Sequence, residues 1–136
     1  MLAPNGTLDT VQHSLYYLNM ETKHAVTLFE ALSSGTRLEL FRLLIRHAPE
    51  GLVAGDIARL LGISASNLSF HLKALVHAGL ITVEKEGKFL RYRAEIPLML
   101  DLIAYLTSEC CSGNPEQCQN FRKASKVVPQ VLPENA

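Results

Sequence analysis

The strongest constraint on the fold comes from residues 51–81, GLVAGDIARLLGISASNLSFHLKALVHAGLI, which predict two helices joined by a tight turn. Gly62 permits the left-handed backbone that ends the first helix, and Ser64 is placed to cap the second. A buried stripe along the second helix is predicted at Leu68, Leu72, Leu75 and Val76. A short helix, a turn containing glycine and a second helix with one buried stripe form the helix-turn-helix pattern.

The opposite face of the second helix is short and polar, as a helix that reads DNA requires. At about 100° per residue, the side chains on this face or at its margins are Ser66, Asn67, Ser69, Phe70, His71 and Lys73. Serine and asparagine near a helix start can meet base edges in a major groove, while a lysine one turn further on can reach phosphate. An ordinary solvated helix face is the alternative interpretation.

A β-hairpin is predicted directly after this helix. Residues 80–83 are a largely β-branched run, residues 85–88 contain a glycine suited to a turn, and residues 89–93 alternate like a returning strand. In this position a hairpin is a wing, and its basic side chains, Lys88, Arg91 and Arg93, can lie along the sugar-phosphate backbone. Charges that protect an edge strand from aggregation are the alternative.

The charges are divided along the chain, although 13 basic residues balance 13 acidic ones. Residues 64–93 hold five Lys or Arg against two Glu, whereas residues 94–119 hold four acidic residues and neither Lys nor Arg. This division indicates two surfaces with separate tasks. No apolar run approaches the roughly 20 residues that span a bilayer, and the N-terminus does not resemble a secretory signal, so we expect a cytoplasmic protein without a membrane partner.

Three further helices are predicted around this centre. One follows Met20 and carries Val26, Leu28, Phe29 and Leu32, a second covers residues 36–47 with Leu38, Phe41, Leu44 and Ile45, and a third covers residues 96–108. The expected fold class is therefore mainly α with a small β-hairpin, a winged helix-turn-helix. Residues 1–20 are interpreted as an N-terminal extension and residues 120–136 as a flexible tail.

The phrases SNLSFHLKALVHAGLI and EKEGKFLRYRAE, with the order of the helices, resemble the ArsR/SmtB family of bacterial metalloregulatory repressors over residues 21–108. The resemblance implies a winged-helix homodimer that binds operator DNA and leaves it when a toxic metal or metalloid ion binds. It also implies that the first and last helices of this region form the dimer interface. On these helices we expect the interface to include Val26, Phe29, Leu98, Leu102, Tyr105 and Leu106.

Two inducer sites known in the family do not match this chain. Arsenic-sensing members often have two cysteines in a stretch similar to Leu-Cys-Val-Cys-Asp, whereas residues 52–56 here read LVAGD. Zinc-sensing members use Asp and His pairs on the last helix; Asp101 could match the carboxylate, but no histidine follows His77. Some arsenic-responsive members instead carry their cysteines beyond the last helix, as this chain does.

All three cysteines of the chain, Cys110, Cys111 and Cys118, lie within residues 109–119, which we call the cysteine segment. The turn-forming residues between them can fold the chain back, which would bring three sulfurs together without a fourth ligand. Three thiolates suit trivalent arsenic or antimony, whereas structural zinc takes four ligands. Other interpretations of these cysteines stay open. They are a redox switch, a zinc or cadmium half-site completed by a second subunit, reactive thiols in a frayed tail, and a two-sulfur site at Cys110 and Cys111 that favours methylarsenite.

The sequence thus predicts a homodimeric transcriptional repressor, released from double-stranded operator DNA by As(III), with Sb(III) or methylarsenite as further inducers. It is not expected to be an enzyme or to hold a catalytic cofactor, because it lacks a Cys-x-x-Cys active site, a Cys/His/carboxylate arrangement and a cofactor loop. A redox-sensing or zinc/cadmium-sensing repressor that uses the same cysteines is the alternative.

Overall fold

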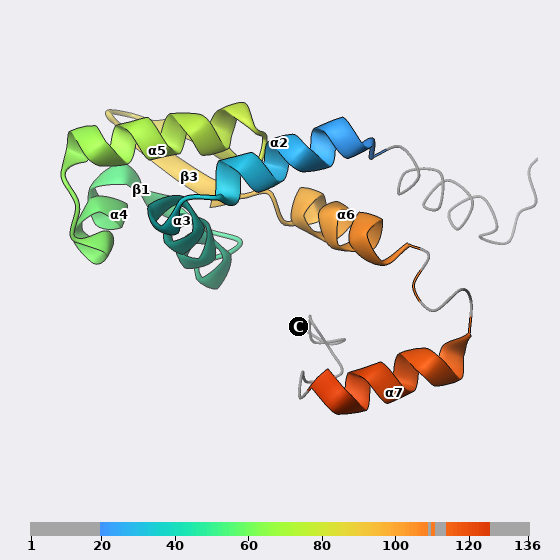
Figure 1. Ribbon diagram of the computed structural model, residues 1–136. Helices are drawn as coiled ribbons and strands as arrows, with labels where there is room; N and C mark the ends of the chain where they lie inside the picture. The colour runs from blue at the N-terminus through green and yellow to red at the C-terminus, as the bar shows by residue number, and fades with distance from the viewer. Residues whose placement is uncertain (1–19, 109, 111–113, 126–136) are drawn as a thin grey trace, which may run out of the picture. The chain divides into compact units, whose positions relative to one another are not determined.

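The computed structural model describes residues 20–108, 110 and 114–125 of the chain. In chain order its elements are α2 (Thr22–Leu32), α3 (Gly35–Arg46), β1 (Leu52–Val53), α4 (Ala54–Leu61), α5 (Ala65–His77), β2 (Ile81–Glu86), β3 (Phe89–Ala94), α6 (Ile96–Thr107) and α7 (Pro115–Ser125) (Figure 1). The chain forms two compact units, with the boundary between Tyr105 and Leu106. Within the described ranges, no helix is long and apolar enough to cross a membrane.

The predicted helix-turn-helix is confirmed as α4 and α5. Gly62 ends α4 in the left-handed region, at φ 66° and ψ 36°. The Ser64 hydroxyl then accepts a hydrogen bond from the backbone N–H of Asn67 at 3.2 Å, which caps α5. The two helices are thus separated by only three residues.

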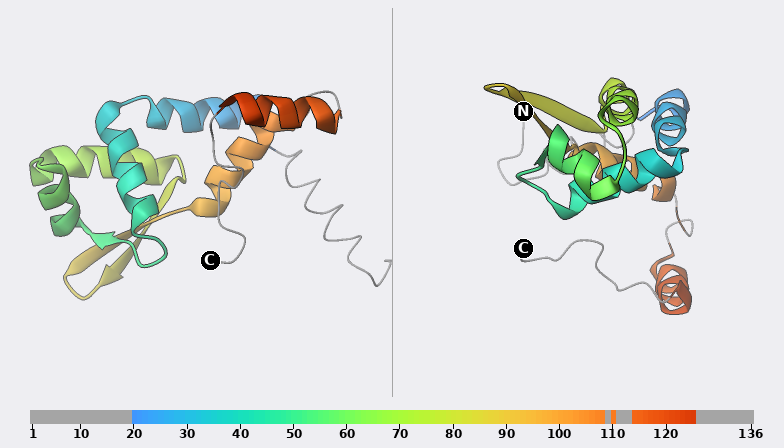
Figure 2. Two further views of the ribbon diagram at one scale, coloured as in Figure 1. Left: turned by 90° about the horizontal axis from the view of Figure 1, so that it is seen from below. Right: turned by 90° about the vertical axis from the view of Figure 1, so that its left-hand side faces the viewer.

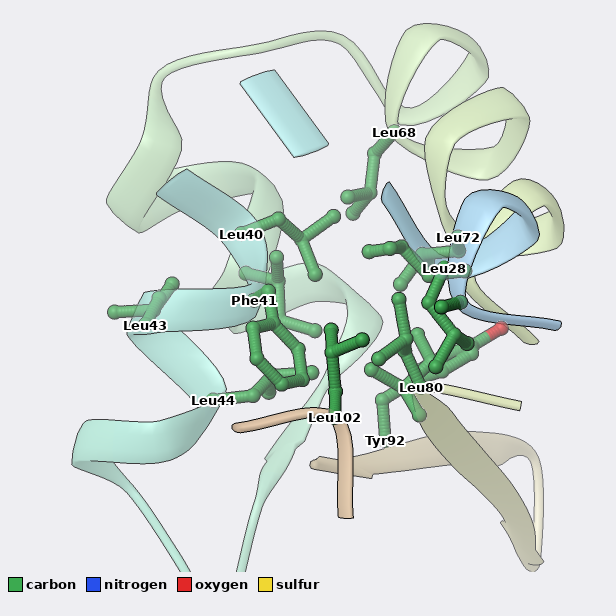
Figure 3. Close-up of a cluster of buried hydrophobic side chains, with 14 of the residues drawn as sticks. Leu28, Leu40, Phe41, Leu43, Leu44, Leu68, Leu72, Leu80, Tyr92 and Leu102 are labelled. Atoms are coloured by element: carbon green, nitrogen blue, oxygen red, sulfur yellow. The ribbon is translucent and has the colours of Figure 1, made fainter. Parts of the chain in front are cut away.

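The core of the first unit is made of buried side chains from α2, α3, α4, α5, α6 and the sheet (Figure 3). The predicted stripe of α5 is confirmed, since Leu68, Leu72 and Leu75 are all at most 4% exposed. In α3 the prediction was wrong at Leu38, which is 44% exposed, while Leu40 is fully buried. The reason is local: Leu38 lies in the first turn of α3, and the buried residues begin in the second turn.

The sheet has three strands rather than the two of the predicted hairpin. Their order is β1-β3-β2, all antiparallel, and β1 pairs Leu52 with Tyr92 and Val53 with Arg91. Gly51 makes this close approach possible: its φ is +73°, and a Cβ there would lie 2.1 Å from the backbone oxygen of Tyr92. A two-residue strand is too short to show an alternating pattern, so the sequence did not predict it.

The hairpin of β2 and β3, residues 81–94, is the wing. Its second strand was predicted within one residue, but β2 continues to Glu86 where a turn had been expected, so only residues 87–88 form the turn. Ile81 and Tyr92 anchor its base in the core, at 1% and 8% exposure. Two views show that the rest of the hairpin projects beyond the helices of its unit (Figure 2).

The second unit contains α7, so residues 120–125, which were placed in the predicted tail, are helical. This helix runs through Ser125 and also includes Cys118, a position for which no helix was predicted. The Asn114 side chain accepts a hydrogen bond from the backbone N–H of Glu116 at 3.1 Å, so it caps the start of the helix. No residue of α7 is buried. Cys111, and the predictions for residues 1–19 and 126–136, lie outside the described residues.

Candidate nucleic-acid interface and cysteine segment

The exposed face of α5 gathers most of the side chains predicted to contact DNA. Ser66, Asn67, Ser69, Phe70 and Lys73 are exposed, and the buried stripe of the same helix holds them against the core. A helix anchored on one face with short polar side chains at the start of the other can enter a major groove. Their contact with DNA remains a prediction.

His71 differs from its neighbours because it is half-buried and faces α3. Its Nδ1 lies 3.5 Å from Nη1 of Arg37, whose Nε donates to the backbone oxygen of Ala31. The rings of His71 and Phe70 meet edge-on, with centroids 5.5 Å apart. Phe70 itself is 67% exposed, the largest fraction among the described large apolar side chains. His71 therefore links α5 to α3 and supports an aromatic ring that points to solvent.

The two arginines of the wing are held by carboxylates of the opposite strand. Nε of Arg91 lies 2.7 and 2.9 Å from the two carboxylate oxygens of Glu86, and its Nη1 donates to the backbone oxygen of Gly51 at 3.3 Å. Nη1 of Arg93 lies 2.6 Å from a carboxylate oxygen of Glu84. The hydrogen bonds that Arg91 donates to the Glu86 carboxylate are the main cause of the raised pKa of Arg91.

Lys88, at the wing turn, has a different environment from the arginines. It is exposed, and its Nζ lies 5.9 Å from the centroid of the Phe89 ring, within the range of a cation–π contact. Lys85 is also exposed, and neither lysine forms an ion pair within the described part of the chain. The sequence indicated the basic residues of the wing but not Glu84 and Glu86 as their partners, although alternation along the hairpin could have suggested such pairs.

The residues predicted for a dimer interface fall into two groups. Val26 and Phe29 on α2 and Leu106 on α6 are 47%, 43% and 60% exposed, so the single chain leaves these three large apolar side chains accessible to solvent. Leu98 and Tyr105 are half-buried against the core, and the Tyr105 hydroxyl hydrogen-bonds that of Thr22 at 2.7 Å, joining α6 to α2.

Leu102 belongs to neither group, and its expected place in the interface needs correction. It is 6% exposed and packs in the core of its own unit (Figure 3). Nearly every residue of α6 is apolar, so the pattern alone could not separate its inward face from its outward one.

Two of the three cysteines are described, and both belong to the second unit. Cys110 is exposed and Cys118 is half-buried, and the Cys118 sulfur lies 4.0 Å from the backbone oxygen of Cys110. Both line a cavity of about 520 Å³ together with Thr107, Phe121, Arg122 and Ser125. Among the described residues, no group of three His, Cys, Asp or Glu side chains could hold a metal ion. Cys111 is outside that set.

Comparison with known proteins agrees with this architecture. Residues 32–84, which include the helix-turn-helix, match a family described as a helix-turn-helix domain. The transcriptional repressor SdpR of Bacillus subtilis (strain 168) is 32% identical over 86 residues, which are 63% of this chain and 92% of that protein. A probable mercury resistance operon repressor of Streptomyces lividans is 33% identical over 75 residues, 55% of this chain; the chain spans 58% of that protein's length.

Solved structures show the same fold. An ArsR-like transcriptional regulator from Rhodococcus sp. RHA1 superimposes with a TM-score of 0.55 at 24% identity, over 78% of this chain and 96% of that one. A possible transcriptional regulator for arsenical resistance gives a TM-score of 0.52 at 28% identity, over 74% of this chain and 97% of that one. The fold, the helix-turn-helix match and these relatives together show that the chain belongs to the ArsR family of winged-helix transcriptional regulators.

Proposed function

We propose that this protein is a homodimeric transcriptional repressor that binds operator DNA through α5 and the wing, and that trivalent arsenic releases it by binding the cysteine segment. The observation that carries the arsenic part is the meeting of Cys110 and Cys118 at one cavity of the second unit, although they are eight positions apart in the chain. Cys111 follows Cys110 directly and would supply the third sulfur.

The DNA-binding part rests on the arrangement of the first unit. The exposed polar face of α5 is held by a buried opposite face, and the wing projects beside it with exposed lysines at and near its turn. In a winged helix these two elements meet the major groove and the adjoining backbone. Repression itself is suggested by the relatives, two of which are named as repressors.

The homodimer is supported by apolar side chains that the single chain leaves exposed. Val26, Phe29 and Leu106 lie on the first and last helices of the region that resembles the family. A second copy of the chain would cover them. The α5 helices of the two copies, the recognition helices, would then read two half-sites of one operator.

The choice of inducer rests on ligand chemistry. Three thiolates satisfy trivalent arsenic, and soft metal ions in general prefer sulfur ligands. The related protein connected with arsenical resistance favours arsenic, while the relative named for mercury resistance makes Hg²⁺ the second candidate for the same thiols. Zinc, cadmium and oxidation remain alternatives that a single experiment can separate.

A release mechanism follows from the position of the cysteines along the chain. Cys110 lies three residues beyond the end of α6, the helix that we assign to the dimer interface. A metalloid that draws the sulfurs together would reshape the end of this helix and change the spacing of the two recognition helices. A complete shift from bound to free needs a preference of about 10⁴-fold for the DNA-incompetent form.

The test is a titration of the reduced full chain on DNA. A duplex selected from a randomised library by the wild-type protein serves as the operator, and fluorescence anisotropy follows release by arsenite, methylarsenite, Hg²⁺, Zn²⁺, Cd²⁺ and peroxide in parallel. We expect arsenite to release the DNA at the lowest concentration. Release by zinc, cadmium or peroxide alone would contradict the arsenic assignment.

Serine variants define the site. Cys110→Ser and Cys111→Ser should keep DNA affinity and lose the arsenite response. Cys118→Ser separates the two versions of the site: loss of the response supports three sulfurs, whereas retained release by methylarsenite supports two. If all three variants left DNA normally on addition of arsenite, the inducer site would have to be abandoned.

A further inference from the structure

The wing carries two ion pairs that run across its strands in the same diagonal direction. In the register of the hairpin, Glu84 faces Arg91 and Thr82 faces Arg93. The ion pairs do not join the directly opposed residues: each arginine reaches the carboxylate two positions further along β2, so Arg91 binds Glu86 and Arg93 binds Glu84. Both arginines of the wing are thus engaged by ion pairs of the same diagonal geometry.

The ion pairs are accessible enough to exchange with DNA. The side chains of Arg91 and Glu86 are 28% and 38% exposed, and those of Arg93 and Glu84 are 35% and 63% exposed. Partly exposed pairs of this kind contribute little to stability. A DNA phosphate can therefore replace a carboxylate. It can do so only where it accepts hydrogen bonds from the guanidinium in a geometry as good as that of the carboxylate.

We propose that Glu84 and Glu86 are specificity-determining residues: they occupy the wing arginines in the free protein and so suppress binding to DNA of arbitrary sequence. In a loosely bound, non-specific complex, the exposed Lys85 and Lys88 contact phosphate while both arginines stay on their carboxylates. In the seated operator complex, the wing is aligned with the backbone and the arginines transfer to phosphate. The displaced carboxylates then lie beside DNA, which disfavours this exchange wherever the alignment is poor.

This inference rests on the proposed DNA-binding function, and the test separates the two. Affinities of the wild type, Glu84→Gln and Glu86→Gln are measured over a range of salt concentrations. The probes are the selected duplex and a scrambled duplex of equal length and composition. A wild type that prefers neither duplex would contradict the proposed function. A wild type that prefers the selected duplex leaves the inference to be decided by the variants.

The expected result is a larger gain for the scrambled duplex than for the selected one. We expect each variant to bind the scrambled duplex about threefold to tenfold more tightly at low salt. The slope of log affinity against log salt should steepen by about 0.9 for each phosphate gained. The ratio of the two affinities should consequently fall.

Two controls separate this effect from a change in net charge or fold. Glu39→Gln changes the net charge equally at an exposed position on α3, and Glu39 has no ion pair within the described residues. The double variants Glu84→Gln/Arg93→Gln and Glu86→Gln/Arg91→Gln also remove the arginine that each glutamate is proposed to occupy. The Glu84 pair is the cleaner case, because Arg91 also binds the backbone oxygen of Gly51.

The inference is supported if the gain for the scrambled duplex appears in the single variants and vanishes in the double ones. It is overturned if Glu84→Gln and Glu86→Gln behave like Glu39→Gln, or if they weaken binding to both duplexes. The last outcome would show that the carboxylates hold the arginines in position for DNA rather than away from it.

Discussion

The two units of this protein differ in what holds them together. All fifteen buried hydrophobic residues of the described chain lie between Met20 and Leu102, in the first unit. In the second, α7 has no buried residue, and its one large aromatic side chain, Phe121, is 63% exposed. The first unit therefore has a core that defines its structure. The described part of the second unit has instead a capped helix, α7, and a cavity.

This contrast fits the proposed division of labour, in which the first unit reads DNA and the second senses an inducer. A recognition helix must keep its side chains in register with base edges, which a packed core ensures. A segment that lacks a core can change shape at a small cost in free energy, so a ligand bridging Cys110 and Cys118 could reorganise it without unfolding the rest.

The largest expected effect tests the difference in packing. Leu40→Ala removes a fully buried side chain and should lower the free energy of unfolding by about 2–5 kcal/mol. Phe121→Ala, in α7, should change it by less than about 0.5 kcal/mol. Urea denaturation followed by circular dichroism measures both. Equal losses would mean that α7 packs as firmly as the first unit.

The next prediction places two charges on α6, on either side of the unit boundary. Leu106→Glu should dissociate the dimer and raise its Kd by more than about 30-fold, since an unpaired charge in an interface costs 2 kcal/mol or more. The folded protomer should survive, because Leu106 is 60% exposed. Leu102→Glu should instead unfold the protomer. Sedimentation and circular dichroism distinguish the two, and a monomeric Leu106→Glu that bound the operator with full affinity would contradict dimeric binding.

A smaller effect is expected from substitutions on the exposed face of α5, in the first unit. Asn67→Ala should cost roughly 1–3 kcal/mol at a contacted base and relax the sequence preference there. Lys73→Ala should weaken binding to all sequences alike and reduce the salt slope by about one phosphate's worth. Titrations on the selected and scrambled duplexes check both. Indistinguishable profiles would mean that α5 enters the groove in another orientation.

The smallest effect compares two helix caps. Ser64→Ala removes the cap of α5 and should lower the stability of the first unit by about 1 kcal/mol. Asn114→Ala removes the equivalent hydrogen bond at α7 and should leave the main unfolding transition unchanged, while it lowers the helix content slightly. A shift of the main transition by Asn114→Ala would show that the two units unfold together.

The sequence predicted the winged helix-turn-helix because strong local signals agree there: the leucine stripe of α5, the Gly62 turn and the Ser64 cap. It missed β1, since two residues carry no periodicity, and it could not place Leu102, since an apolar helix has no marked face. The pairing of Arg91 with Glu86 depends on the register of the wing. The turn at residues 87–88 sets that register, whereas the sequence predicted a longer turn over residues 85–88. For the cysteines, ligand chemistry suggested a site, but their spacing did not predict that Cys118 is helical.

Gly51 and β1 have a consequence for the kind of DNA that this protein can accept. Because β1 ends at Val53 and α4 begins at Ala54, the same short stretch of backbone joins the wing to the helix-turn-helix. The wing cannot swing independently of α4 without breaking that pairing. Recognition helix and wing are thus held at a fixed span, and a duplex must present its major groove and neighbouring backbone at that distance. We expect base steps that widen or narrow the grooves to alter affinity even at positions that no side chain touches.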